Sequence, residues 1–249
     1  MLRKRLVTVL AFVDGVLHRT KEFTPDYRYT LNFVDAWSVD EIVVLDVTRH
    51  GAAPRPEFTQ VVSQFARKCF VPLSVGGGIR CIDDVRRYLA VGADKVVVNT
   101  GAIRRPELIT EIAQAYGSQC VVLAIDVRRD GQGGYEVMSD NGTTPTGMTP
   151  EDWARRAAEL GAGEIMVTSI ERDGSLLGYE LDLCRRVVAA VNIPVLICGG
   201  AGNWTHFVDG FGKTGCSAVC TANIYHFTES SIRSAKKVLE KAGIPIRPA

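Results

Sequence analysis

Residues 71–78 read VPLSVGGG and residues 193–200 read IPVLICGG, so one apolar stretch that ends in glycine occurs twice. Residues 40–45 (DEIVVL) and 163–168 (GEIMVT) repeat at nearly the same spacing, about half the chain. Self-similarity over so long a period indicates two half-domains that close on each other, rather than a solenoid of short repeats.

Short apolar runs alternate along the whole chain with amphipathic stretches. Unbroken apolarity is typical of strands that are covered on both faces, and the stretches between them have helical spacing. We therefore predict one (β/α)8 barrel over residues 1–249, with half-barrels of about 1–118 and 119–249. An open doubly wound sheet is the rival, but it would not need two matching halves. The eight expected strands are Leu6–Leu10, Ile42–Leu45, Pro72–Val75, Val96–Val98, Val121–Ile125, Ile165–Thr168, Val195–Ile197 and Ala218–Thr221.

The composition is that of an ordinary globular protein, with 46% apolar residues, 23% charged residues and a net charge of +1. This charge gives no indication of a nucleic-acid or membrane-surface partner, and no apolar run is long enough to span a bilayer. Seven cysteines without CxxC spacing suit a reducing compartment, so we expect a cytoplasmic protein. The four histidines show no metal-binding spacing, so we expect neither a metal site nor another cofactor.

Glycine clusters end the third and seventh expected strands, and polar residues end the strands that follow each of them. Glycine lets backbone N–H groups approach an anion closely, and the loops after the last strands of such barrels commonly bind phosphate. The two clusters predict two phosphate sites on opposite rims of the barrel, although tight strand-to-helix turns would also explain the glycines. The polar residues are Asn99 and Thr100 in the first half and Asn223 in the second.

Three acidic residues lie at or just beyond strand ends, where barrel enzymes place their chemistry. Asp126 closes an apolar run, so it should be partly desolvated and suited to general acid or base catalysis. Asp46 ends the second strand, and Asp173 lies in a turn after the sixth, where a structural role is nearly as plausible as a ligand role.

Four charged residues stand at or near strand starts, and hence at the opposite end of the barrel. Each alone would be read as a solvated rim charge, but two positive and two negative charges in a ring of strands could form a salt-bridged plug on the barrel axis. These residues are Arg5, Glu41, Lys95 and Glu164.

Two long connections interrupt the rhythm of strands and helices. Residues 19–37 follow the first strand, and residues 128–147 follow the fifth. The second is rich in turn residues around Tyr135–Met138, so we predict a β-hairpin there. Both connections follow strands and are therefore candidate lids over the functional end of the barrel.

Taken together, these motifs resemble the cyclase subunit of imidazole glycerol phosphate synthase, over essentially the whole chain. That family takes ammonia from a glutaminase partner through the barrel axis and adds it to a ribulosyl phosphate at the carboxyl-terminal face. The most specific matches are residues 75–79 (VGGGI), 92–96 (GADKV), 124–126 (AID), 161–165 (GAGEI), 168–174 (TSIERDG), 199–202 (GGAG) and 226–227 (HF).

The resemblance implies a role for each matched residue. Asp126 would be one of two catalytic aspartates, and Arg19 stands where the family has a lysine that grips substrate. Asp94 would contact a HisH-like glutaminase. Gly78, Asn99 and Thr100 would hold one phosphate, Asp173, Gly174, Gly200 and Asn223 the other, and Arg5, Glu41, Lys95 and Glu164 would form the ammonia gate.

One departure bears on the reaction. The family's other catalytic aspartate ends the first strand, where this chain has Ala11, which cannot transfer a proton. Losing one of two acid–base groups typically removes about 10²–10⁴ in rate.

We therefore expect a specialised relative that docks a glutaminase and delivers ammonia to a non-histidine acceptor, such as a sugar of a surface polysaccharide. The first alternative is a genuine cyclase, in which Asp46 or another nearby group replaces the missing acid. The second is a non-catalytic subunit that only activates the glutaminase.

Overall fold

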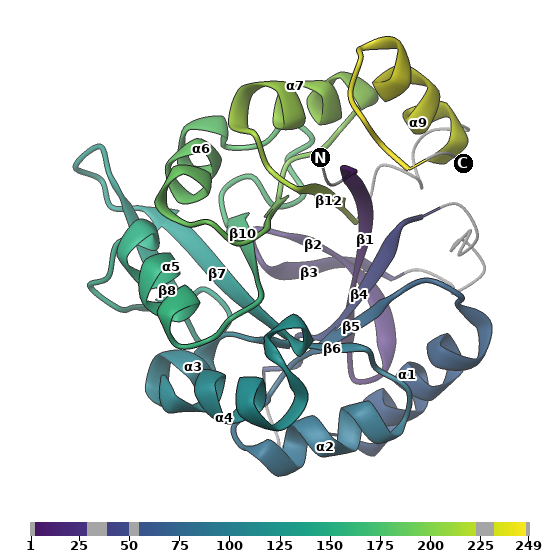
Figure 1. The fold of residues 1–249 in the computed structure, drawn as a ribbon, viewed down its shortest axis with the longest axis vertical. Coiled ribbons are helices and arrows are strands. Elements are labelled where there is room, and N and C mark those ends of the chain that lie inside the picture. Colours follow the sequence, from purple (N-terminus) through teal and green to yellow (C-terminus); the bar gives the residue numbers. More distant parts are fainter. Residues whose placement is uncertain (1–2, 29–38, 50–54, 223–231, 248–249) are drawn as a thin grey trace.

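The computed structural model describes residues 3–28, 39–49, 55–222 and 232–247. Eight parallel strands form a closed barrel with helices around its outside (Figure 1), which confirms the predicted fold. Neighbouring strands pair in chain order, and the pairing of β12 with β1 closes the ring. All eight expected runs coincide with the barrel strands, which are β1 (Arg5–Val13), β4 (Glu41–Asp46), β5 (Leu73–Gly76), β6 (Lys95–Val98), β7 (Val121–Arg129), β10 (Glu164–Ser169), β11 (Val195–Cys198) and β12 (Ala218–Thr221).

The helices bury their apolar faces against the outside of the barrel. In α1 the buried residues Phe58, Val61, Val62 and Phe65 recur at helical spacing. At the start of α5 the Thr149 side chain accepts a hydrogen bond from the backbone N–H of Asp152, which satisfies a free donor of the first turn. The helices are α1 (Pro56–Lys68), α2 (Ile82–Ala90), α3 (Thr100–Arg104), α4 (Glu107–Tyr116), α5 (Pro150–Glu159), α6 (Leu181–Ala190), α7 (Trp204–Thr214) and α9 (Ile232–Lys241), with a 3₁₀ turn, η2, at Ser118–Cys120.

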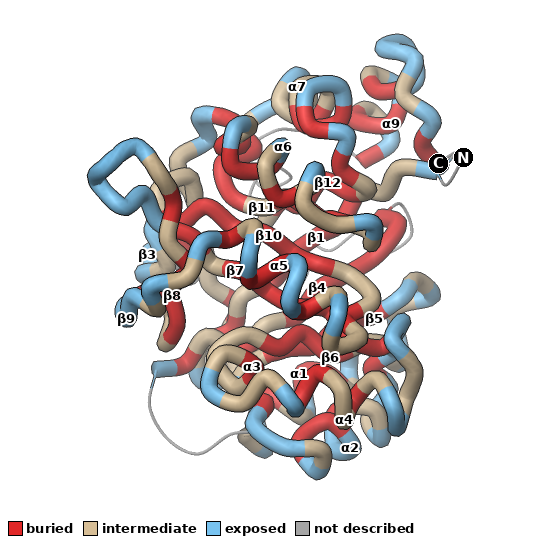
Figure 2. Tube along the Cα trace, turned by 60° about the vertical axis from the view of Figure 1, so that its left-hand side comes forward, coloured by how far each residue is buried: buried red, intermediate tan, exposed pale blue. Residues whose placement is uncertain are grey.

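Alternation along the strands divides the apolar residues between two cores. Leu6, Leu10 and Phe12 of β1 pack between the barrel and the helices, whereas Val7 and Val9 face the barrel interior. Figure 2 shows the strands as the buried centre, with exposed segments on the outer sides of the helices. Because a strand alternates with period two, the parity of a residue decides whether it faces the interior.

Two antiparallel hairpins extend the sheet at the carboxyl ends of the strands. The predicted hairpin is confirmed: β8 (Tyr135–Ser139) pairs with β7 and with the short β9 (Thr144–Pro145). The connection after β1 was expected as a loop, but its first part forms β2 (Val16–Lys21) and β3 (Thr24–Arg28). This hairpin continues β1 through a tight turn, and residues 29–38 lie outside the described part.

The last helix is fastened to the start of the sheet. Lys236 Nζ of α9 lies 2.8 Å from Asp40 Oδ1, and both side chains are almost fully buried. Asp40 Oδ2 also accepts a hydrogen bond from the backbone N–H of Leu6. None of the described helices has the length and hydrophobicity that crossing a membrane would require.

Candidate active site and charged ring

The four charged residues at the strand starts form a closed ring of ion pairs. Arg5 lies 2.7 Å from Glu41 Oε2 and 2.9 Å from Glu164 Oε1. Lys95 Nζ lies 3.0 Å from Glu41 Oε1 and 2.9 Å from Glu164 Oε2. Each cation therefore bridges both carboxylates, and the salt-bridged plug that the sequence suggested is present.

The ring is recessed into the lower, amino-terminal end of the barrel. The Glu41 side chain is only 1% exposed and also accepts a hydrogen bond from the Ser74 hydroxyl, at 2.8 Å. Burial alone would lower the pKa of Arg5, but the charges of Glu164 and Glu41 outweigh burial and raise it. The guanidinium is thus held in its charged form, since a buried charge is tolerated when it is paired.

Above the ring, the barrel interior is lined by small apolar side chains. These are mainly valine and alanine, with Met166 and Leu196 as larger members, and the two cysteines Cys198 and Cys220 also belong to this interior cluster. The axis therefore passes from a charged ring through an apolar section to a polar mouth at the carboxyl ends of the strands.

Asp126 lies on the inner face of β7 at the barrel mouth, two residues beyond the inward-facing Ala124. Asn99 Nδ2, directly after β6, donates a hydrogen bond to Asp126 Oδ2 at 2.5 Å. Burial raises the pKa of Asp126 to about 7, the negative charge of Asp173 adds to the rise, and the bond from Asn99 opposes it. Near neutral pH the carboxyl is therefore divided between its acid and base forms, which suits proton transfer.

Ala11 lies on the inner face of β1, on the far side of the barrel from β7, where it offers no polar group. The expectation that Asp46 could replace the missing acid is wrong. Leu45 packs with the barrel interior, so Asp46 faces outward. There its Oδ2 lies 2.5 Å from Arg55, and its side chain is only 1% exposed. Asp46 serves as a structural ion pair behind the barrel wall.

The first glycine cluster reaches the mouth beside Asn99 and Thr100. Gly77 has a φ of +114°, and a Cβ there would lie 2.4 Å from the Asp46 carbonyl oxygen, so this position requires glycine. Gly78 is exposed with a φ of +67°. Thr100 Oγ1 accepts a hydrogen bond from the Asp140 backbone, and Asn99 Oδ1 is buried without a donor among the described residues.

The second cluster is also packed against backbone. A Cβ on Gly200 would lie 2.2 Å from the Gly178 carbonyl oxygen, and one on Gly174 would lie 2.4 Å from the Thr20 carbonyl oxygen. At these two positions the glycine therefore makes room for a neighbouring backbone carbonyl. Asp173 lies beside Gly174, and burial raises its pKa, although hydrogen bonds from Thr20 and Phe23 oppose the rise. Asn223 lies outside the described residues.

The β2–β3 hairpin crosses the mouth, and Figure 1 shows it between β1 and β10. At its tip the Phe23 N–H donates to Asp173 Oδ2, and the Glu22 N–H donates to the Asp173 carbonyl. Arg49, after β4, donates to the Phe23 carbonyl. Arg19 forms an ion pair with Asp26 of the same hairpin, so the predicted substrate-gripping residue sits on the element that covers the site.

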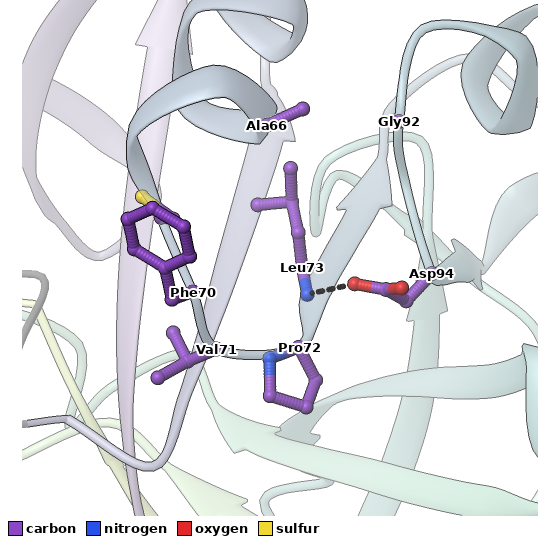
Figure 3. Close-up of a pocket in the computed structure, with 8 residues that line it drawn as sticks. Ala66, Phe70, Val71, Pro72, Leu73, Gly92 and Asp94 are labelled. Carbon is purple, nitrogen blue, oxygen red and sulfur yellow. Dashed lines mark hydrogen bonds between the residues drawn. The ribbon is translucent and has the colours of Figure 1, made fainter.

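An open pocket lies on the lower face (Figure 3), and its lining includes Asp94, the residue before Lys95 of the ring. It lies between the end of α1 and the loop before β6, and its lining includes Phe70, Val71 and Pro72. Asp94, the expected partner contact, is exposed here, and its Oδ2 accepts a hydrogen bond from the Leu73 N–H at 2.8 Å. Phe70 is 78% exposed, which is unusual for so large an apolar side chain.

The sequence reasoning missed three polar residues. Ser74 donates a hydrogen bond to Glu41 of the ring. It lies two residues before Gly76 on β5, and the alternation of side chains along that strand could have identified it as facing the barrel interior. His18 and Thr20 lie on β2, and no signal for them was available while that segment was expected to be a loop. No cluster of three or more His, Cys, Asp or Glu side chains suited to a metal ion occurs within the described ranges.

Comparisons with known proteins agree over most of the chain. A family model described as histidine biosynthesis protein matches residues 8–231. Over 213 residues the chain is 44% identical to the imidazole glycerol phosphate synthase subunit HisF of Gluconacetobacter diazotrophicus, with 86% of this chain and 82% of that protein covered.

Proposed function

Because the chain belongs to the histidine biosynthesis protein family, we propose that it is the synthase subunit of a glutamine-dependent complex resembling imidazole glycerol phosphate synthase. It would take ammonia from a HisH-like glutaminase at the lower face and add it to an acceptor at the mouth. The observation that carries the proposal is the pairing, in one barrel, of a closed ion-pair ring below with a carboxyl of pKa about 7 above.

The lower face suits ammonia delivery. Ammonia is small and neutral, so an apolar section lined by valine and alanine is a lesser barrier to it than to an ion. The ring would admit ammonia when one of its ion pairs opens. The glutaminase would dock on the adjoining face, where Phe70 is exposed and Asp94 offers a charge.

The mouth suits addition to a phosphorylated carbonyl compound. Asp126 can give or take a proton near neutral pH. We propose that Gly78, Asn99 and Thr100 bind one phosphate, since Asn99 contacts Asp126, Thr100 follows Asn99 at the start of α3, and Gly78 is exposed after the neighbouring strand β5. The second phosphate would lie near Asp173, Gly174 and Gly200, with Asn223, beside the tip of the β2–β3 hairpin.

Two acceptors deserve comparison. A ribulosyl phosphate, converted by a genuine cyclase reaction, is supported by the 44% identity to a HisF subunit. A non-histidine acceptor, such as a surface-polysaccharide sugar, is favoured by Ala11 and by the outward orientation of Asp46. We put the ribulosyl phosphate first, because the identity to a HisF subunit extends over 86% of the chain and Asp126 offers a proton-transfer group at the mouth.

The test supplies the purified chain with ammonia and the ribulosyl phosphate, and then with glutamine and a HisH-like glutaminase. We expect imidazole glycerol phosphate to form in both cases, and Asp126→Asn to lower the rate by about 10²-fold or more. Asp130→Asn, in an exposed turn of the β7–β8 hairpin, is the control and should act as wild type. Glutaminase activation without product would instead favour the sugar acceptor or the activating subunit, and glutamine-dependent amination in a third enzyme would select the former.

A further inference from the structure

We propose that His18 is the second acid–base group of this mouth and occupies the side where Ala11 provides none. The inference rests on the proposed ammonia-dependent reaction. It starts from the antiparallel pairing of β1 with β2, in which Ala11 is directly opposite His18.

The pairing determines which way His18 faces. Side chains directly opposite each other in an antiparallel pair lie on the same face, with Cβ atoms about 5 Å apart. The neighbouring pair, Phe12 and Leu17, packs into the outer core. Ala11 and His18 therefore share the other face, which is the face of Val7 and Val9 inside the barrel.

A second contact places this part of β2 over the mouth. Thr20, two residues after His18, hydrogen-bonds to the Asp173 carboxylate. Asp173 in turn is close enough to Asp126 for its charge to act on that carboxyl. The strand thus runs from the Ala11 side of the mouth, where His18 lies, toward Asp173.

The imidazole is oriented by a local hydrogen bond. His18 Nδ1 lies 2.9 Å from the Val16 carbonyl oxygen, and a carbonyl accepts only from a protonated nitrogen. In the neutral ring this leaves Nε2 with its lone pair, ready to accept a proton. His18 is partly exposed, so a substrate can reach it. The charged groups around this end of the molecule include Arg28, which is paired opposite His18 on β3, and the Arg19–Asp26 ion pair of the same hairpin. The others are Asp14, Lys21, Glu22, Arg49, Asp126 and Asp173.

Together His18 and Asp126 can complete a balanced proton cycle. Ammonia adds through its lone pair to a carbonyl carbon, the carbonyl oxygen takes the proton of Asp126, and His18 Nε2 takes a proton from the new ammonium group. The resulting carbinolamine loses water when the imidazolium protonates its hydroxyl. The Asp126 carboxylate then takes a proton from nitrogen, which leaves an imine and restores both groups.

The test compares His18→Gln with wild type in ammonia-dependent turnover of the ribulosyl phosphate. We expect kcat to fall about 10²-fold or more, with KM changed less than about threefold. Ala11→Asp added to His18→Gln should restore at least about tenfold, because it returns an acid to the same face. Lys21→Gln, an exposed residue of the same strand, should retain the wild-type rate.

The pH profile separates proton transfer from a structural role. A base must be unprotonated, so the wild-type rate should show an acidic limb, a rise with pH, that disappears in His18→Gln. An acid must be protonated, so the rate should fall as pH rises through about 7, the pKa of Asp126, in both proteins. A His18→Gln rate within threefold of wild type, or an unchanged acidic limb, would overturn the inference alone. A wild-type protein that forms no product would overturn the proposed function, and this role of His18 with it.

Discussion

Replacing Asp126 by asparagine should stabilise the protein at high pH. The folded protein holds this carboxyl at a pKa of about 7, whereas an unfolded chain has a value near 4. Below pH 4 both states are protonated, and the group contributes no difference. Between pH 4 and pH 7 the folded state keeps a proton that the unfolded state releases, so the contribution to stability falls as pH rises and stays low above pH 7.

The size of the effect follows from the shift. A shift of about three units corresponds to at most about 4 kcal/mol of unfolding free energy. Water at the barrel mouth reaches part of this side chain and screens it, so we expect about 2 kcal/mol. Asparagine is uncharged and keeps an oxygen that can accept the hydrogen bond from Asn99. The variant should therefore lose the pH-dependent cost and retain the local contact.

The assay is urea unfolding, followed by circular dichroism at steps from pH 4 to pH 8.5, for both proteins. The unfolding free energy of Asp126→Asn minus that of wild type should rise between pH 4 and pH 7 and then level off. Asp130→Asn is a control of opposite sign, because hydrogen bonds from the Gln132 and Gly134 backbones lower the pKa of the exposed Asp130. Parallel curves for Asp126→Asn and wild type, or a difference that shrinks as pH rises, would refute the reasoning.

Two further predictions concern the lower end of the barrel. Arg5→Ala removes a cation that bridges Glu41 and Glu164. It should therefore uncouple glutamine hydrolysis from product formation, while the circular dichroism spectrum remains that of the folded barrel. Coupling is measured as product formed per glutamine consumed, and an unchanged ratio would count against an ammonia gate. Phe70→Ser, at a 78% exposed position, should weaken glutaminase binding at least about tenfold, a loss of about 1.4 kcal/mol. Isothermal titration measures this affinity, and the unfolding midpoint should not change. Equal affinities for the variant and the wild type would place the interface elsewhere.

The sequence was sufficient for the barrel because strand burial and internal repetition are local signals. All eight strands were found as apolar runs, since each is covered on both faces. The ring was also predictable, because Arg5, Glu41, Lys95 and Glu164 all sit at strand starts, and the starts of parallel strands meet at one end of the barrel.

The direction of the acidic side chains was harder to predict. Asp46 and Asp126 both end apolar strands, yet one faces the helices and the other faces the mouth. A continuous apolar run conceals its parity, because residues on both faces are buried alike. The β2–β3 hairpin was missed for a different reason, since its sequence alternates polar residues without an apolar face. Its pairing depends on the exposed edge that β1 offers.

If His18 has the role proposed above, a missing residue in one strand does not leave the site incomplete. Proton transfer requires a group on a given face at a given height, and the antiparallel pairing of β1 with β2 provides two positions there, Ala11 and His18. In this geometry the two positions are alternatives, so the double variant Ala11→Asp with His18→Gln should be more active than His18→Gln alone. Equal rates for His18→Gln and for the double variant would mean that an acid at position 11 does not restore the reaction. The face shared by the two positions would then be structural, and the chemistry would rest on Asp126 alone.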